Sequence, residues 1–534
     1  MPVNSSWRNT NSPHKDLVYG DNVIATSEPH ATEAGVDAFR NGGNAVDAAL
    51  AAAITLTVTE PCSNGIGGDG FAIVAHKGEL FGLNASGKSP VAWNRDYFNR
   101  YESMPERGWD SVTTPGAVSQ WVALSDRFGT LPFRDLFNTA IGHAREGFKL
   151  GAKVSDGFQS ARKVFKDFPD FLRTWLPEGF EPVEGAVFKN PAQAETLEEI
   201  AATKGESFYH GQLAQKIVEH AQSTGGWLSV EDLATHQPLW VDPISVDYRD
   251  CTVHEIPPNG QGLVALIALG ILNHFPLDKW DPDSPDSIHT KIEAIKIGFA
   301  EAFQHVCDPD SWMHAAYGVL ESNYLTDRAK SISMKFASLP EATVFQDHGT
   351  VYLSAGDSEG TMVSLIQSNY MGFGSGIVIP DTGISLQNRG HGFDLTPGHP
   401  NEVSGGKRPF HTIIPAMVTK SGDPLFAFGV MGRYMQPQGH VQVLSRILDN
   451  DWNPQASSNA PRWMVTPDFE LTFEEGFDEK TIEDLKHRGH RVVSDDHPGL
   501  YGGHQGVFKL ENGYCASSDH RKDGYAKAFS RNQN

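Results

Sequence analysis

A short segment around residue 350 constrains the fold most, because it has every feature of a β-hairpin. Residues 351–355 alternate between aliphatic and hydroxyl-bearing side chains, the period of two that indicates a strand. The turn formers of residues 357–360 follow, and a second alternating run covers residues 362–368. An antiparallel pairing centred on this turn places Thr350 directly across from Ser368.

Facing residues in such a pair have Cβ atoms ~5 Å apart, so two hydroxyl groups would be neighbours. If the Gly349–Thr350 peptide bond is cut, Thr350 carries both a hydroxyl and a free α-amine. An α-amine has a pKa near ~7.8, so much of it is unprotonated at neutral pH. This combination of nucleophile and base is the N-terminal threonine form of nucleophilic catalysis. The alternative is that both residues are ordinary solvated positions on a sheet edge.

Length and charge limit the classes of protein to consider. The chain has 534 residues and no long Ser/Gly- or Pro-rich linker, which favours one large α/β unit or two interlocked lobes. A formal charge of −23 predicts a soluble protein that does not bind nucleic acid non-specifically. The most apolar run, residues 45–58, contains Asp47 and is too short to span a bilayer, so no membrane association is expected.

The pattern of cysteine, histidine and glycine predicts no cofactor and no metal. Four cysteines lie far apart without CxxC spacing, and the polar N-terminus has no signal-peptide pattern, so we expect a cytoplasmic protein. The 22 histidines form no paired metal motif. The glycine-rich loop of residues 65–70 lacks the GK[ST] ending of a phosphate loop, and a tight turn before a strand explains it better.

The order of the expected elements indicates the architecture. Helical patterns cover residues 132–146, 194–203, 212–223 and 289–306, whereas strand patterns occur near both ends of the chain. Strands at both ends with helices between them suggest two packed sheets covered by helices on each side.

Several separated segments resemble the γ-glutamyltranspeptidase family of N-terminal nucleophile hydrolases. They are NGGNAVDAALAAA, EPCSNGIGGDGF, TTPGAVSQW, FYHGQLAQKIV, GTVYLSAGDSEG, GFGSGIVIPDTGISLQNRG and DHRKDGYA, and the similarity extends from about Tyr19 to Ala528. The resemblance implies an α+β fold, the four-layer αββα sandwich of these hydrolases. It also implies a proenzyme that cuts itself before Thr350.

The products of that cut would be a large subunit of residues 1–349 and a small subunit of residues 350–534, together forming one αββα domain. The resemblance therefore implies a heterodimer of the chain's own two fragments, and it leaves open a dimer of such pairs. The expected partner is a small-molecule amide substrate. In this family the threonine attacks a γ-glutamyl amide, and water or an acceptor amine then releases the glutamyl group from the ester.

The resemblance also assigns catalytic positions. Thr350 falls on the nucleophile, and Ser368 falls on the hydroxyl that binds the threonine amine. The family's oxyanion-binding glycine pair reads Gly432-Arg433 here. Because any residue has a backbone N–H, the oxyanion site can survive the arginine, which adds a cation beside it.

The departures from the family pattern concern substrate recognition. The arginine that follows Asn-Ala in glutathione-specific members is replaced by Ser86, and Lys88 is a candidate for supplying the missing charge. The family's serine pair reads His411-Thr412, and an asparagine beyond the second hydroxyl reads Tyr370. The stretch whose aspartate binds the glutamyl amine contains Arg389, a candidate carboxylate clamp whose alternative is a surface or interface arginine.

These differences favour a small anionic acyl group that lacks an amine. They place the chain with glutathione-hydrolase-like proteins and oxamate amidohydrolases, and cephalosporin acylases are a third relative. An alternative from another class is an uncleaved, inactive family member that serves as a scaffold.

Overall fold

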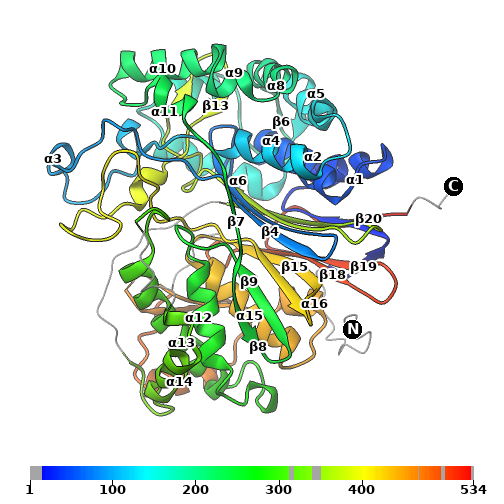
Figure 1. The fold of residues 1–534 in the computed structure, drawn as a ribbon, viewed down its shortest axis with the longest axis vertical. Helices are drawn as coiled ribbons and strands as arrows, with labels where there is room; N and C mark the ends of the chain where they lie inside the picture. The colour runs from blue at the N-terminus through cyan, green and yellow to red at the C-terminus, as the bar shows by residue number, and fades with distance from the viewer. Residues whose placement is uncertain (1–14, 312–317, 339–349, 467, 495–498, 531–534) are drawn as a thin grey trace.

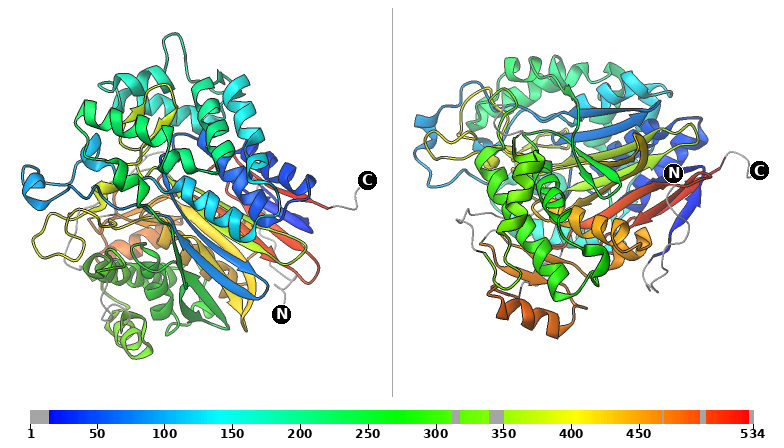
Figure 2. Two further views of the ribbon diagram at one scale, coloured as in Figure 1. Left: turned by 45° about the horizontal axis from the view of Figure 1, so that its top comes forward. Right: turned by 60° about the horizontal axis from the view of Figure 1, so that its bottom comes forward.

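The computed structural model describes residues 15–311, 318–338, 350–466, 468–494 and 499–530. Two seven-stranded antiparallel sheets lie face to face, and helices cover the outer face of each sheet (Figure 1). The two further views in Figure 2 show the same succession of layers. The four-layer αββα sandwich expected from the sequence is therefore confirmed.

The first sheet has the strand order β20-β2-β10-β11-β3-β4-β7 and the second has the order β1-β19-β18-β15-β14-β9-β8. The strands of the first sheet are β2 (Asn22–Ala25), β3 (Asp69–His76), β4 (Glu79–Asn84), β7 (Leu239–Val241), β10 (Val351–Gly356), β11 (Met362–Ser368) and β20 (Ala526–Phe529). Those of the second are β1 (Val18–Gly20), β8 (Ile244–Tyr248), β9 (Cys251–Glu255), β14 (Ala416–Lys420), β15 (Asp423–Met431), β18 (Gly503–Lys509) and β19 (Tyr514–Ser518). Short pairs lie outside the sheets: β5 (Phe148–Lys149) with β6 (Val187–Phe188), β12 (Val378–Ile379) with β13 (Ile384–Ser385), and β16 (Trp463–Val465) with β17 (Leu471–Phe473).

The helices divide into two groups, one on each side of the sandwich. The group over the first sheet comprises α1 (Pro29–Arg40), α2 (Ala45–Thr59), α4 (Ala117–Phe128), α5 (Asn138–Glu146), α6 (Ala152–Val164), α7 (Pro169–Trp175), α8 (Pro191–Thr203), α9 (Glu206–Tyr209), α10 (Gln212–Thr224) and α11 (Val230–Ala234). The short helix α3 (Arg95–Phe98) lies at the edge of the molecule, in a loop away from this sheet. The group over the second sheet comprises α12 (Gly262–Leu272), α13 (Pro285–His305), α14 (Ser322–Ser331), α15 (Met435–Leu448), α16 (Pro454–Asn459) and α17 (Glu479–His487). Short 3₁₀ turns include η5 (Arg389–Gly392).

Helix α2 shows why the sequence forms these layers. Its N-cap is Asn44, whose side chain accepts hydrogen bonds from the backbone N–H groups of Val46 and Asp47 in a capping box. All fifteen residues of the helix are buried, because the helix is apolar on every side and lies between the first sheet and the outer helices.

Strand β10 is buried on both faces. Val351, Leu353 and Ala355 point into the core under the outer helices, whereas Tyr352 points into the core between the two sheets. The strand lies between β2 and β11, so the alternative of a solvated edge strand is wrong. Its serine and tyrosine side chains occupy the inner face that packs on the second sheet.

The two predicted subunits are interleaved within both sheets. In the first sheet β10 and β11, which follow the predicted cut, lie between β2 and β3, which precede it. In the second sheet β14 pairs with β9, again joining the two parts of the chain. Cleavage before Thr350 would thus leave two fragments that share both sheets of one domain.

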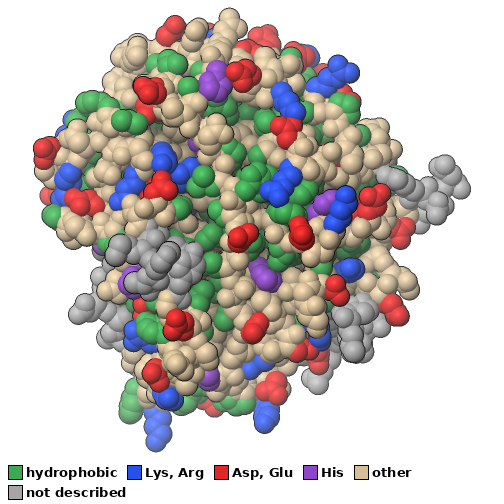
Figure 3. Space-filling view, viewed as in Figure 1, with side chains coloured by type: hydrophobic (Ala, Val, Ile, Leu, Met, Phe, Trp, Pro, Cys, Tyr) green, Lys and Arg blue, Asp and Glu red, His purple; other side chains and the backbone are tan. Residues whose placement is uncertain are grey.

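The surface carries charges of both signs. Figure 3 shows acidic and basic side chains interspersed over one face without a broad patch of a single sign. No helix among the described residues is long and apolar enough to cross a bilayer. All four cysteines are free thiols.

Candidate active site

The start of β10 brings together the two predicted hydroxyl groups. Strands β10 and β11 pair in the register expected from the sequence, with Val351 opposite Gln367. One step beyond this pair, the Thr350 hydroxyl donates a hydrogen bond to Ser368, with 3.2 Å between Oγ1 and Oγ. Both side chains are buried. Gly349 lies outside the described residues, so cleavage of the Gly349–Thr350 bond stays a prediction.

Tyr370 connects this hydroxyl pair to two buried guanidinium groups. Its backbone N–H donates to the Ser368 hydroxyl at 2.8 Å. Its φ of 74° is in the left-handed region. The centre of its ring lies 4.6 Å from Cζ of Arg389 and 5.0 Å from Cζ of Arg433, within the range of cation–π contacts. The structure thus brings four predicted site residues into one cluster beside Thr350.

Arg389 is fully buried in this cluster, so the alternative of a surface arginine is wrong. Its Nη1 donates to the Thr412 hydroxyl at 2.8 Å, which fixes the orientation of the guanidinium group. Its Nε and Nη2 atoms have no hydrogen-bond partner among the described residues. These two atoms form one edge of the guanidinium fork, the edge that binds a carboxylate with two parallel hydrogen bonds. Burial lowers the pKa of Arg389 to about 9, which still leaves it charged at neutral pH.

His411 lies in the same region but faces a carboxyl group that the sequence did not single out. Its Nε2 is 3.3 Å from Oδ2 of Asp69, and both side chains are fully buried. Burial raises the pKa of Asp69 to about 7, and the positive charge of Arg389 opposes this rise. Burial also holds the pKa of His411 well below its usual range, so the imidazole is neutral. One feature of the sequence could have pointed to Asp69 as a site residue: it is a charged residue at the end of a glycine-rich loop that leads into a buried strand.

The predicted oxyanion site, Gly432-Arg433, forms the turn between β15 and α15. The φ values of these residues are 124° and 51°, both in the left-handed region. Three residues earlier, Gly429 packs directly on the ring of Tyr352, which an added Cβ would overlap. Because Tyr352 is two residues from Thr350, the turn lies at the same end of the sandwich as the hydroxyl pair.

Gln261 connects the loop that contains Thr412 to the oxyanion turn, and the sequence analysis did not identify it. Its side-chain amide donates to the backbone carbonyls of Thr412 at 2.6 Å and Arg433 at 2.7 Å. One buried amide therefore fixes both the partner of Arg389 and the oxyanion turn.

The structure does not bring Lys88 into the cluster. Its Nζ forms an ion pair with Asp310 at 3.1 Å, and the two side chains are 41 % and 75 % exposed. Of the substrate-binding residues predicted from the sequence, Tyr370, Arg389, His411 and Thr412 are buried together and Lys88 is at the surface.

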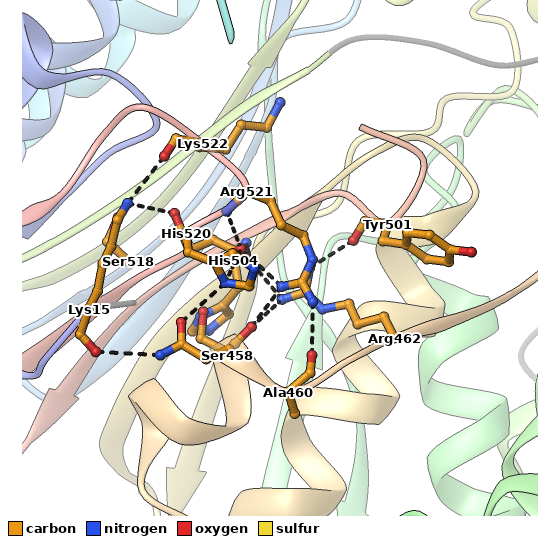
Figure 4. A network of polar contacts seen from close by, with 12 residues as sticks. Lys15, Ser458, Ala460, Arg462, Tyr501, His504, Ser518, His520, Arg521 and Lys522 are labelled. Atoms are coloured by element: carbon orange, nitrogen blue, oxygen red, sulfur yellow. Dashed lines mark hydrogen bonds and ion pairs between the residues drawn. The ribbon is translucent and has the colours of Figure 1, made fainter. Parts of the chain in front are cut away.

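A second buried network supports the strand next to the oxyanion turn. Asp519 binds Arg462 at 2.6 Å and also accepts the backbone N–H of His504 on β18 at 2.7 Å. Figure 4 shows Arg462 reaching the carbonyl of Tyr501 and the neighbouring Arg521 reaching that of Ala460. The adjacent arginines hold the pKa of Asp519 well below its usual range. This network fixes the loop that begins the DHRKDGYA segment.

One group of side chains has the composition of a metal site. The ligand atoms of His289, Glu293 and His490 lie within 4.8 Å of one another. However, Nδ1 of His289 is 2.8 Å from Nε2 of His490, closer than the ~3.4 Å that two nitrogens bound to one tetrahedral zinc require. Lys296 also places its ammonium 2.5 Å from Glu293. The group is therefore built as a hydrogen-bonded and ion-paired cluster.

Comparison with known proteins identifies close relatives of the whole chain. A family model described as gamma-glutamyltranspeptidase matches residues 31–529. The chain is 34% identical over 520 residues to the glutathione hydrolase-like YwrD proenzyme of Bacillus subtilis, covering 94% of this chain and 99% of the relative. It is 32% identical over 519 residues to the oxamate amidohydrolase proenzyme of Klebsiella pneumoniae, covering 94% and 97%.

Solved structures show the same fold. The crystal structure of cephalosporin acylase from Bacillus halodurans matches with a TM-score of 0.93 and 40% identity, covering 99% of each chain. The sequence segments that carry the resemblance therefore belong to a full-length structural match.

Proposed function

Because the chain belongs to the gamma-glutamyltranspeptidase family, we propose that it is a self-processing amidohydrolase acting on γ-glutamyl or small anionic acyl amides through a threonyl ester. The observation that carries this proposal is the 3.2 Å contact between the Thr350 and Ser368 hydroxyls at the first residue of a central strand. The alternative of an inactive scaffold does not explain why the Thr350–Ser368 hydroxyl pair, the oxyanion turn and a buried arginine fork lie together in one cluster.

Processing uses the same hydroxyl as later turnover. Thr350 Oγ1 attacks the carbonyl carbon of Gly349, the peptide C–N bond breaks, and the departing nitrogen becomes the α-amine of Thr350. Water then hydrolyses the resulting ester and leaves a free carboxylate on Gly349. The products are a fragment of residues 1–349 and a fragment of residues 350–534.

In each turnover the free α-amine takes the proton of the Thr350 hydroxyl while the oxygen attacks the substrate amide. Ser368 orients the hydroxyl and the amine. The backbone N–H groups of Gly432 and Arg433 stabilise the oxyanion that forms. The amine of the substrate then leaves, taking the proton that the α-amine of Thr350 had accepted. Finally the same α-amine activates a water molecule, which hydrolyses the threonyl ester.

Arg389 supports a compact anionic acyl group as the preferred substrate. Its unpaired Nε and Nη2 edge is buried, and an unpaired buried donor costs about 1–3 kcal/mol. A carboxylate on the acyl group satisfies both donors at once. The name of the oxamate amidohydrolase relative agrees with such a substrate.

The experiment compares hydrolysis of oxamate, succinamate, glutaramate, γ-glutamyl-anilide and glutathione by processed enzyme. Arg389→Met should raise KM for the best anionic amide by about 10- to 150-fold, the effect of losing about 1.5–3 kcal/mol from a charged hydrogen bond. The KM of the Arg389→Lys enzyme should lie between those of the wild-type and Arg389→Met enzymes, because lysine keeps the positive charge but has no guanidinium fork.

Lys88→Met is the matched control, since it removes a cation that the structure places at the surface with Asp310. It should leave KM unchanged. Equal KM values for wild-type and Arg389→Met enzyme would show that Arg389 does not bind the acyl carboxylate. Glutathione as the best substrate would favour γ-glutamyl amides over small anionic acyl amides as the substrates of this enzyme.

We further propose that the two fragments stay associated after cleavage, because their strands alternate within both sheets. A cytoplasmic location and an assembly of two such pairs are proposals from the sequence and the family resemblance.

A further inference from the structure

One buried amide connects the two ends of the predicted site. The side-chain NH₂ of Gln261 donates one hydrogen bond to the carbonyl of Thr412 at 2.6 Å and one to that of Arg433 at 2.7 Å. Because both partners are acceptors, these bonds fix which end of the amide carries the nitrogen. Thr412 holds the guanidinium group of Arg389 through its hydroxyl, and Arg433 belongs to the oxyanion turn. The amide therefore sets the acyl end of the site and the oxyanion end relative to each other.

Gln261 is itself held firmly. It is the N-cap residue of α12, in which all eleven residues are buried. Its backbone N–H donates to the carbonyl of His411 at 2.9 Å, so its main chain and its side chain bind neighbouring residues of the same segment. A side chain whose own backbone is fixed in this way can hold another loop in one position.

The turn that Gln261 holds has an unfavourable backbone conformation. Arg433 has a φ of 51°, in the left-handed region that residues other than glycine, asparagine and aspartate rarely adopt. Such a conformation persists only where the surrounding structure fixes it. Two hydrogen bonds fix the Arg433 carbonyl, one from the backbone N–H of Gln436 at 3.0 Å and one from the Gln261 side chain. Loss of the second bond would allow the turn to relax, and the N–H groups that it presents to the oxyanion would move.

Stability alone does not explain the placement of Gln261. Its Oε1 atom is buried and has no hydrogen-bond partner among the described residues, which is a cost to the folded state. Gln442 of α15 is the contrasting case, since its amide donates to the carbonyl of Trp463 and accepts from the backbone N–H of the same residue. Both ends of the Gln442 amide are satisfied. The amide of Gln261 leaves its oxygen unpaired in order for its nitrogen to reach both halves of the site.

We propose that Gln261 is a positioning residue, which holds the oxyanion turn in its left-handed conformation beside the acyl pocket. This inference rests on the proposed function, and it adds a residue that contributes to the reaction without binding the substrate. Because Gln261 acts through the backbone of Arg433, its effect should appear mainly in kcat rather than in KM.

The test measures kcat and KM for succinamate on processed enzyme. Gln261→Met keeps the approximate size of the side chain and removes both donors. It should lower kcat by about 5- to 30-fold, which corresponds to the ~1–2 kcal/mol that a left-handed arginine costs. KM should rise by less than about threefold, since the acyl pocket keeps Arg389.

Gln442→Met is the matched control, because it also removes a buried amide, but one that is bonded to β16 rather than to the site. It should lower the free energy of unfolding in urea and leave kcat unchanged. A loss of kcat as large as that of Gln261→Met would show that any buried amide of this layer has the same effect, and would overturn the inference.

A change in the turn itself separates positioning from packing. Glycine adopts the left-handed conformation about as readily as the right-handed one, so Arg433→Gly removes most of the need to hold the turn. Gln261→Met should therefore lower kcat by only about twofold in the Arg433→Gly background, measured against Arg433→Gly alone. If Gln261 only fills space, the loss of kcat should be the same in both backgrounds.

An unchanged kcat in Gln261→Met, or equal losses with and without Arg433→Gly, would overturn the inference. If Gln261→Met does not fold, Gln261→Asn decides by the same comparison, because its shorter side chain keeps an amide that cannot reach both carbonyls. A variant that folds but is slow to mature is compared by its rate of self-cleavage, in which attack on the Gly349 carbonyl forms an oxyanion at the same turn. A processed wild-type enzyme that hydrolyses none of the amides would instead contradict the proposed function.

Discussion

Replacing Ser368 by alanine isolates the contribution of one hydroxyl group to the reaction. In the structure this oxygen accepts hydrogen bonds from the Thr350 hydroxyl and from the backbone N–H of Tyr370. Losing the acceptor of a buried donor costs about 1–3 kcal/mol. Loss of the hydrogen bond to the reacting Thr350 hydroxyl should lower kcat by about 5- to 150-fold. Loss of the hydrogen bond to the backbone N–H of Tyr370 should instead lower the free energy of unfolding.

The assay measures kcat and KM for succinamate on fully processed enzyme, together with the unfolding free energy in urea. Ser364→Ala is the matched control. This serine is also buried on the inner face of β11, but it bonds the hydroxyl of Tyr352 rather than Thr350. The control should lose stability with little change in kcat. Ser368→Thr keeps the hydroxyl and should retain most of the activity. Equal kcat values for the two alanine variants would refute a role for Ser368 in orienting the nucleophile.

Three further predictions concern processing, pH and stability. Thr350→Ser should process more slowly than wild type on a denaturing gel, while Thr350→Ala should stay a single inactive chain. Burial lowers the pKa of His504 to about 3, below the ordinary value of 6.5, so the unfolded chain binds this proton first and stability falls as pH drops below about 6.5. His504→Gln should therefore lose about 2 kcal/mol less unfolding free energy than wild type between pH 7 and pH 5, and an equal loss would contradict this. Lys296→Met leaves Glu293 buried without its partner and should cost about 3–5 kcal/mol in urea unfolding, much of which Glu293→Gln in the same chain should recover.

The hairpin and its register could be predicted because all the information is local. Alternating side chains and one turn fix which residues face each other between Thr350 and Ser368. Helix α2 can also be recognised from local sequence alone, since a capping residue, Asn44, precedes an apolar segment long enough for a helix.

The position of Asp69 could not be predicted, because it depends on pairing between strands far apart in the chain. Only the β3–β11 ladder places it opposite Ser368, about 300 residues later. The environment of Arg389 could not be predicted for the same reason, since its partner Thr412 and the ring of Tyr370 come from separate loops. Lys88 was a candidate by sequence distance alone, and its side chain turns outward to Asp310.

Two buried helices over the second sheet also escaped prediction. Helix α12 is an uninterrupted apolar run of eleven residues, and periodicity cannot distinguish such a run from a buried strand. Helix α15 contains Pro437 near its start and Gly439 shortly after, two residues that usually argue against a helix. Pro437 is in the first turn of the helix, where its missing N–H costs nothing, and Gly439 packs against Val430 of β15.

The central claim is that Thr350 becomes the first residue of a catalytic subunit. The most direct measurement is intact mass analysis of the purified protein together with N-terminal sequencing of its smaller fragment. The account predicts two fragments, residues 1–349 and 350–534, with the smaller one beginning TVYLS and both eluting together in a native column. A single unbroken chain that nevertheless hydrolyses the amides, or a fragment beginning at any residue other than Thr350, would contradict it.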